Sequence, residues 1–420
     1  MNTSSKNIFS AALGNLLEGY DFAIYAILAP ILAVVFFPNL DPMISLMLVF
    51  SVFAFSFLVR PLGGLLFGYL GDQVGRKQAL IISILVMSLV TLLLGLLPSY
   101  ATIGIWAPIL LTLLRLIQGI AISGEMTTAM TYLVEHAHQS QRGLLGSLVM
   151  CTGAGGAVIS SALIALITAG VTEEQLFAWG WRIPFLLGGL IGLIVLLMRF
   201  QFEETVLYQT VKKRVKNKPS FFEYYKQLPY KPIVMAVLLT SIMAMSYYFV
   251  VGYFNAFLIE TLHLPLNQVM MINFVCLLAL TGLIPIMGII SDKLGRKPVL
   301  MSGIIGLILL IHPIFALLQQ DEIYLVFMGE FIFVIIISSI LATIPATLAE
   351  MFQVDNRNSG VSLGYNLSQA IFGGTAPLIA LELTVMTQNL YAPAWYLLAG
   401  ALVSLLTLLT IKESYQQPLK

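Results

Sequence analysis

The chain has 420 residues, of which 59% are hydrophobic and only 10% are charged, and its formal net charge is +1. Because a soluble domain carries roughly 25% charged residues, this composition excludes a soluble enzyme, and the near-neutral charge indicates no nucleic-acid partner. One membrane crossing needs roughly 20 apolar residues, so the composition predicts a chain that crosses a lipid bilayer many times.

Apolar stretches of this length occur in two groups along the chain. The first group lies at about Ile8–Phe37, Met43–Leu70, Ala79–Leu97, Ile105–Val134, Leu144–Ile167 and Trp181–Phe200. The second group lies at about Ile233–Ile259, Val269–Ile290, Val299–Leu318, Ile323–Ala349, Val361–Met386 and Tyr391–Ile411. We therefore predict an all-α membrane protein with twelve transmembrane helices, in which residues 1–200 form one six-helix bundle, residues 201–230 a linker and residues 231–420 a second six-helix bundle.

Lysine and arginine are unevenly distributed over the loops between these helices. The loops on one side of the membrane contain neither residue type. The loops on the other side contain Arg76, Lys77, Arg142, Lys212, Lys213, Arg214, Lys216, Lys218, Lys293, Arg296, Lys297 and Arg357. By the positive-inside rule, we expect this side, both chain termini and the linker to be cytoplasmic.

Two acidic residues lie one helical turn apart in the first apolar stretch. Glu18 and Asp21 share a helical stripe with Tyr25. An ionisable side chain in a membrane span costs roughly 2.5 to 3.5 kcal/mol, so such residues face a cavity or one another. Desolvation and mutual repulsion disfavour their charged forms, which makes both acids candidates for proton exchange. Hydrogen bonds that only pack helices together are the alternative.

The fourth apolar stretch carries polar residues along one helical stripe. Arg115, Gln118 and Glu125 fall at i, i+3 and i+10, which separates the guanidinium from the carboxylate by roughly 15 Å along the helix axis. Arg115 is therefore available to bind a substrate carboxylate, with Gln118 beside it, or to pair with Glu18 or Asp21. Glu125 is a further candidate for proton coupling.

Other ionisable residues in apolar stretches give weaker indications. Arg60 lies in the second stretch and is followed by a proline, and for it we favour a structural role. Glu330 lies roughly 10 Å into the tenth stretch, where it could couple protons or extend to the interface. The two cysteines, Cys151 and Cys276, both lie in apolar runs, so we expect neither a disulfide framework nor a metal site.

The two halves of the chain share a repeated motif. Residues 68–77 read GYLGDQVGRK and residues 288–297 read GIISDKLGRK. Glu135 and Arg142 are similarly matched by Glu350 and Arg357, with the same spacing in each pair. Parallel repeats are used by carriers that move two bundles around a site near the membrane midplane. The repeat therefore favours a carrier over a channel.

The two G-x-x-x-D-x-x-G-R-K turns resemble the characteristic cytoplasmic loop of the major facilitator superfamily, although Gln73 stands where that pattern prefers a basic residue. The resemblance implies that these turns act as a latch between the bundles. The residues expected in this conformational gate are Asp72, Gly75, Arg76, Glu135, Arg142, Asp292, Gly295, Arg296, Glu350 and Arg357.

Longer segments narrow the resemblance to the metabolite:proton symporters of that superfamily, in particular the proline and glycine betaine carriers. They include GNLLEGYDF (14–22), FLVRPLGGLLFG (57–68), RLIQGIAISGE (115–125), WGWRIPF (179–185) and YNLSQAIFGGTAP (365–377). The resemblance implies a monomer in a bacterial cytoplasmic (inner) membrane. It also places in the cavity the residues Tyr247, Tyr248, Asn255, Tyr365, Asn366 and Gln369. Their aromatic faces suit an ammonium group, although tyrosine is equally common in helix packing.

The sequence contains no Walker A motif, HExxH helix or nucleophile elbow, so we expect neither ATP-driven transport nor hydrolysis, and no cofactor. We expect a proton-coupled importer of a small carboxylate-bearing metabolite, such as proline or glycine betaine. Arg115 would hold the carboxylate, and Glu18, Asp21 and Glu125 would be coupling candidates. The alternatives are a di- or tricarboxylate substrate, such as 2-oxoglutarate or citrate, and a ligand sensor without net flux.

Overall fold

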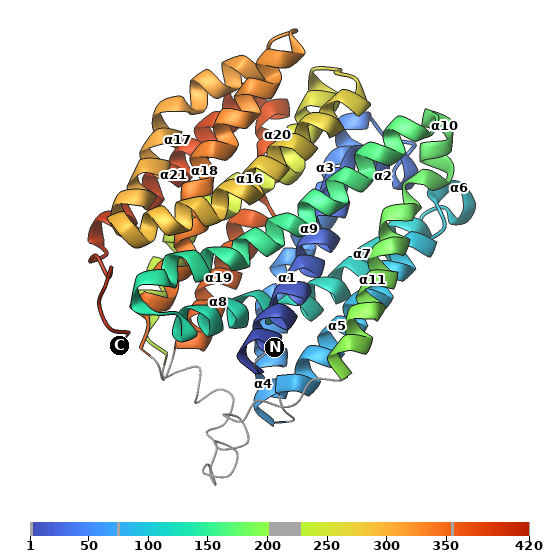
Figure 1. Ribbon diagram of the computed structural model, residues 1–420. Helices are drawn as coiled ribbons and strands as arrows, with labels where there is room; N and C mark the ends of the chain where they lie inside the picture. The colour runs from blue at the N-terminus through green and yellow to red at the C-terminus, as the bar shows by residue number, and fades with distance from the viewer. Residues whose placement is uncertain (1–2, 74–75, 201–227, 354–356, 420) are drawn as a thin grey trace.

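The computed structural model describes residues 3–73, 76–200, 228–353 and 357–419. Within these ranges every regular element is a helix. In Figure 1 the helices of the N-terminal half, coloured blue to green, lie beside those of the C-terminal half, coloured yellow to red.

The N-terminal half contains long helices and several short ones. They are α1 (Thr3–Ile27), α2 (Ala29–Phe36), α3 (Pro42–Leu58), α4 (Arg60–Gln73), α5 (Arg76–Leu96), α6 (Tyr100–Ile103), α7 (Trp106–Ile122), α8 (Glu125–His136), η1 (Gln139–Gln141), α9 (Arg142–Gly170), α10 (Glu173–Gln175), η2 (Leu176–Gly180) and α11 (Arg182–Phe200).

The C-terminal half contains long helices interrupted by π-helical turns. Its elements are α14 (Tyr230–Tyr248), η3 (Phe249–Tyr253), α15 (Phe254–Ala256), η4 (Phe257–Thr261), α16 (Leu266–Leu294), α17 (Arg296–Leu318), α18 (Ile323–Met351), α19 (Arg357–Ser368), η5 (Gln369–Gly373), α20 (Ala376–Thr387) and α21 (Ala392–Thr410).

These helices account for the twelve predicted crossings. In the described part of the chain, ten helical stretches are long and apolar enough to span a membrane. The stretches Gly14–Ile27 of α1 and Ala29–Phe36 of α2 meet at a bend of 60° and pass the same test when they are taken together as one crossing. The shorter apolar stretch Ile81–Leu96 of α5 lies where the third crossing is predicted. The all-α, twelve-helix prediction is therefore confirmed.

Several crossings are interrupted where the sequence analysis expected one continuous helix. Pro30 lies in the first turn of α2, and Pro61 lies in the first turn of α4. Proline is tolerated there because it has no N–H group to donate, whereas inside a helix it breaks a backbone hydrogen bond. Gly124 lies between α7 and α8, and glycine is a poor helix former, which accounts for the interruption there.

The two halves meet along several helices. The largest contact joins α9 to α16, which lie side by side in Figure 1, and a second joins α1 to η3. In addition, α8 contacts both α18 and α19. We call the end of the molecule at which Arg142, Arg296 and Arg357 lie the basic end. The division at residues 200 and 231 stays a prediction, because residues 201–227 lie outside the described ranges.

Within the N-terminal half, α1 and α9 touch backbone to backbone. A Cβ atom at Gly19 would lie 2.7 Å from the carbonyl carbon of Gly153, and one at Gly156 would lie 2.5 Å from the amide nitrogen of Tyr20. Only glycine permits this approach without displacing a helix. The contact places Glu18, which precedes Gly19, beside the middle of α9.

Candidate functional site

A central cavity lies between the two halves of the molecule. It contains about 570 Å³ of space outside atoms, open space at its mouth included. Its polar and aromatic lining residues are Glu18, Phe22, Arg60, Tyr247, Tyr248, Tyr365 and Gln369. The rest of its wall is apolar or glycine and comes from α1, α8, α9, α14, η3 and α18. A concave, mainly apolar site with a few polar groups is typical of small-molecule binding.

Arg60 and Glu18 form an ion pair on the wall of this cavity. Nη2 of Arg60 lies 3.4 Å from Oε1 of Glu18, and the two side chains are 3% and 9% exposed. The Arg60 guanidinium also lies over the rings of Phe22 and Phe57, at 4.3 and 4.2 Å from their centroids. Among the described residues, Oε2 of Glu18 and Nε of Arg60 have no hydrogen-bond partner. Each side chain of the pair therefore keeps one polar atom that no described residue binds.

The break between α3 and α4 holds Arg60 at a rigid position. Leu58 ends α3, Arg60 begins α4, and Pro61 follows it. Two residues beyond the proline, Gly63 lies so close to α7 that a Cβ atom would approach the carbonyl carbon of Ile120 to 2.8 Å. The packing of α4 on α7 thus fixes the position of Arg60, and a binding group needs such a rigid support.

Three tyrosines lie in the part of the cavity wall that comes from the C-terminal half. The Tyr248 ring packs edge-on against Phe53 and Phe57, with centroids 5.5 and 5.0 Å apart, and its neighbour Tyr247 lies 5.2 Å away. The Tyr365 hydroxyl donates to the sulfur of Met126 on α8, at 3.0 Å. The aromatic wall therefore spans both halves of the molecule.

Arg115 lies beside the cavity but is not part of its lining. Its Nη1 donates to Oε1 of Gln118 at 2.5 Å, and its guanidinium lies 4.3 Å from the centroid of the Tyr25 ring. Gln118 donates in turn to Thr91, and Thr91 donates to Asp21 at 2.9 Å. The structure brings these predicted residues together as a network inside the N-terminal half. It gives the cavity-facing position to Arg60, for which the sequence favoured a structural role.

The remaining predicted residues lie at other places. The Asn255 side chain donates to Val251 in its own helix, and Asn366 donates across the halves to the carbonyl of Ser123 at 2.9 Å. Glu125 lies close enough to Glu18 for their charges to interact but is outside the cavity lining. Glu330 is fully buried in α18, away from the cavity lining.

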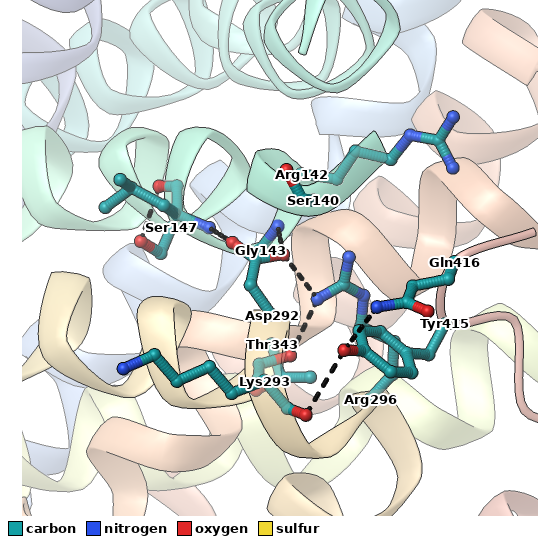
Figure 2. Close-up of polar contacts among 12 residues, drawn as sticks. Ser140, Arg142, Gly143, Ser147, Asp292, Lys293, Arg296, Thr343, Tyr415 and Gln416 are labelled. Carbon is teal, nitrogen blue, oxygen red and sulfur yellow. Dashed lines mark hydrogen bonds and ion pairs between the residues drawn. The ribbon is translucent and has the colours of Figure 1, made fainter. Parts of the chain in front are cut away.

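Asp292 of the second repeat connects the two halves at the basic end. Its Oδ1 accepts a hydrogen bond from the Gly143 amide at 2.7 Å, and its Oδ2 accepts one from the Leu144 amide at 2.8 Å. These amides belong to the first turn of α9, whose N–H groups have no partner within the helix. Figure 2 shows Asp292 between Gly143 and the Arg296 guanidinium, whose Nη1 lies 2.9 Å from Oδ1.

The acid and the arginine that recur with the same spacing in each half form ion pairs between the halves. Nη1 of Arg357 lies 2.7 Å from Oε1 of Glu135, and Nη1 of Arg142 lies 4.0 Å from Oε1 of Glu350. Each arginine is therefore paired with the acid of the other half. Glu350 also pairs with Arg296 at 3.2 Å.

The glycine of the second turn has a backbone that other residues rarely adopt. Gly295 has φ = 104°, in the region that favours glycine. In the first repeat, Gly75 and the side chains of Asp72 and Arg76 lie outside the described residues. The roles assigned to them stay predictions.

The segment after α21 adds contacts that the sequence analysis missed. Glu413 accepts hydrogen bonds from the amides of Arg296 and Lys297, at 3.2 and 2.9 Å. Nη1 of Arg142 donates to the carbonyl of Gln417 at 2.7 Å. No motif marks this segment, because its contacts depend on tertiary packing: those of Glu413 lie within the C-terminal half, and that of Gln417 joins the two halves.

Comparison with known proteins assigns a family to this arrangement. The sequence model described as Major Facilitator Superfamily matches residues 11–377 and 236–418. The glycine betaine/proline/ectoine/pipecolic acid transporter OusA of Dickeya dadantii is 36% identical, and the match covers 99% of this chain and 84% of OusA. The proline/betaine transporter of Escherichia coli is 35% identical, with 99% and 85% covered.

Solved structures support the same fold. The xylose transporter XylE from E. coli, in a partially occluded inward-open conformation, matches with a TM-score of 0.79 over 97% of each chain, at 18% identity. A crystal structure of a D-xylose-proton symporter matches with a TM-score of 0.76 and 19% identity, covering 98% of this chain and 99% of that one.

Proposed function

The chain belongs to the major facilitator superfamily, and from this premise we propose that it is a proton-coupled symporter that imports a small zwitterion, proline or glycine betaine. At the coarser level it is a multi-pass membrane transporter of a small molecule and not an enzyme. The names of the relatives described above support the choice of proline or glycine betaine.

The Arg60–Glu18 ion pair in the cavity is the observation that carries this proposal. A substrate carboxylate binds a guanidinium with two parallel hydrogen bonds. When the substrate carboxylate binds Arg60, the Glu18 carboxylate loses the cation that lies 3.4 Å from it. A buried carboxylate without a cation is strongly disfavoured, so Glu18 takes up a proton. Substrate and proton therefore bind together, and each strengthens the binding of the other.

The aromatic wall provides the complementary part of the site. A carboxylate on Arg60 directs the cationic nitrogen of a zwitterion toward the tyrosines on the other side of the cavity. Cation–π contacts with such rings contribute roughly 0.5 to 2 kcal/mol. Tyr247, Tyr248 and Tyr365 all line the cavity, and Tyr248 is held by its contacts with Phe53 and Phe57. This wall favours a zwitterion over a polycarboxylate.

Arg115, Gln118, Asp21 and Tyr25 take a supporting role in this proposal. Their network holds α1 against α7 and fixes Phe22, which contacts both Arg60 and Arg115. Arg115 thus positions the wall on which the carboxylate binds.

The basic end is the cytoplasmic end in this proposal. It carries Arg142, Arg296 and Arg357, and basic residues are enriched on the cytoplasmic side of membrane proteins. Both termini then lie in the cytoplasm, in a bacterial inner membrane. The contacts of Asp292, Glu135 and Glu350 close the cytoplasmic side, and their release opens the cavity toward the cytoplasm.

Uptake into liposomes tests the proposed function. We expect protein reconstituted with an inward proton gradient to accumulate labelled proline or glycine betaine, and a protonophore to abolish this accumulation. One proton moving across 100 mV supplies about 2.3 kcal/mol, which corresponds to roughly 50-fold accumulation.

Other results of the same assay contradict the proposal. Accumulation of 2-oxoglutarate or citrate in place of the zwitterions would overturn the substrate assignment. Counterflow that does not respond to the proton gradient would overturn symport. Binding without uptake would identify a sensor.

A further inference from the structure

Glu330 is a buried carboxyl group that the central site does not use. It lies on α18, it is completely inaccessible to solvent, and it is not part of the cavity lining. In the described residues neither of its oxygens completes a hydrogen bond. It is the eighth residue of α18, so it lies roughly 10 Å along the helix from the end opposite the basic end.

In the described ranges, no cation lies near Glu330 to balance a negative charge. Phe333, one turn further along α18, packs against Phe254, whose centroid is 5.0 Å away, and Phe254 packs against Phe315. Isolated ions are very costly in such an apolar environment. The carboxyl group is therefore held in its neutral, protonated form.

The titratable groups on the helices around α18 do not change this conclusion. Cys276 on α16 is within electrostatic range of Glu330, and a thiol supplies no positive charge. His312 on α17 instead lies against the ring of Trp395, with centroids 4.3 Å apart. The charged residues that adjacent helices contribute to the basic end, at the far end of α18 from Glu330, include Glu135, Arg142, Asp292, Lys293, Arg296, Lys297 and Arg357.

Asn273 is the polar side chain that faces Glu330, and it also connects the two halves of the molecule. Its Oδ1 accepts a hydrogen bond from the hydroxyl of Ser161 on α9 at 3.0 Å. Its Nδ2 donates to the carbonyl of Val250 at 2.7 Å, within the π-helical turn η3. The amide therefore contacts both α9 and the segment that follows the cavity tyrosines.

We propose that Glu330 and Asn273 form a second proton-binding site, separate from the cavity. The Ser161–Asn273 hydrogen bond controls the exchange of this proton with the solution at the end opposite the basic end. While α9 and α16 stay in contact, the proton on Glu330 is shielded. When the halves separate at this end, the bond breaks, water reaches Asn273, and Glu330 exchanges its proton. This inference extends the proposed proton coupling, but its test uses no substrate.

Infrared difference spectroscopy on the full-length protein in lipid tests the protonation state. We expect a carboxylic acid C=O band in the wild type that is absent from Glu330→Gln, shifted in frequency in Glu330→Asp and retained in Glu18→Gln. A spectrum that is the same in the wild type and in Glu330→Asp would overturn the site. This comparison remains decisive if Glu330→Gln fails to fold.

The rate at which this band shifts after transfer to D₂O tests the gate. Ser161→Ala removes the bond between the halves, so we expect exchange at least several-fold faster than in the wild type. Ser160→Ala is the matched control, because within the described part of the chain the Ser160 hydroxyl donates to the carbonyl of Ala157 in its own helix. Equal exchange rates in the two serine variants would contradict the gate. Failure of the transport proposal would leave both results unaffected.

Discussion

Replacing Glu18 with glutamine (E18Q) is expected to abolish proton-driven accumulation while preserving substrate counterflow. Glutamine resembles the protonated carboxylic acid in shape, but it neither binds nor releases a proton. Arg60 loses its partner in the variant and stays available to a substrate carboxylate. The accumulation ratio in liposomes should therefore fall from roughly 50-fold per 100 mV to no accumulation, with exchange of labelled for unlabelled substrate maintained.

The matched control for E18Q is Glu173→Gln. Glu173 is an exposed acid on α10 and is not part of the cavity lining, so its replacement should leave accumulation unchanged. Proton-driven accumulation that survives in E18Q would contradict the assignment of Glu18. Loss of counterflow together with accumulation would show that Glu18 is needed for substrate binding itself.

Replacing Asp292 with asparagine (D292N) is expected to open the basic end of the molecule. Asp292 accepts hydrogen bonds from two amides of α9 and contacts Arg296 at 2.9 Å. Asparagine has one acceptor oxygen and no charge, so it leaves at least one of the two α9 amides without its charged partner. A hydrogen bond to a charged group contributes roughly 1.5 to 3 kcal/mol, so losing one such bond between the halves shifts the closed-to-open ratio by roughly 10- to 100-fold.

Spin labels across the basic end measure this opening. His138 and Lys293 are exposed residues of the two halves, and they can carry the labels once Cys151 and Cys276 have been replaced. We expect a longer 138–293 distance in D292N than in the parent protein. The control Asp321→Asn alters an exposed acid in the turn before α18 and should leave the distance unchanged. An unaltered distance in D292N would contradict the gate.

The residues that make the contacts at the basic end could be identified from the sequence because they recur in both halves of the chain, and their role as a gate stays a prediction. The GRK turns and the paired Glu and Arg residues identify Asp292, Arg296, Glu350 and Arg357 from the sequence. Their partners were not predictable, because Asp292 caps α9 of the other half. Such a contact depends on how two bundles dock, and no local pattern encodes it. The contacts of Glu413 with the amides of Arg296 and Lys297 lie within the C-terminal half, and they were missed because they depend on how distant segments of that half pack.

The cavity shows the limit of helical periodicity. The spacing of Arg115 and Gln118 correctly places them on one helical face, and the structure pairs them. Periodicity does not say whether that face meets the cavity or another helix of the same bundle. The interruption before Pro61, which places Arg60 beside Glu18, also lies outside what a continuous apolar stretch indicates.

The proton balance of substrate binding tests the central claim most directly. In weakly buffered solution with a pH-sensitive dye, the purified protein should take up about one proton for each zwitterion bound, because the carboxylate displaces Glu18 from Arg60. The E18Q variant should bind the same substrate without proton uptake. Binding of proline or glycine betaine to the wild type with no proton uptake, or equal uptake by E18Q, would contradict the account.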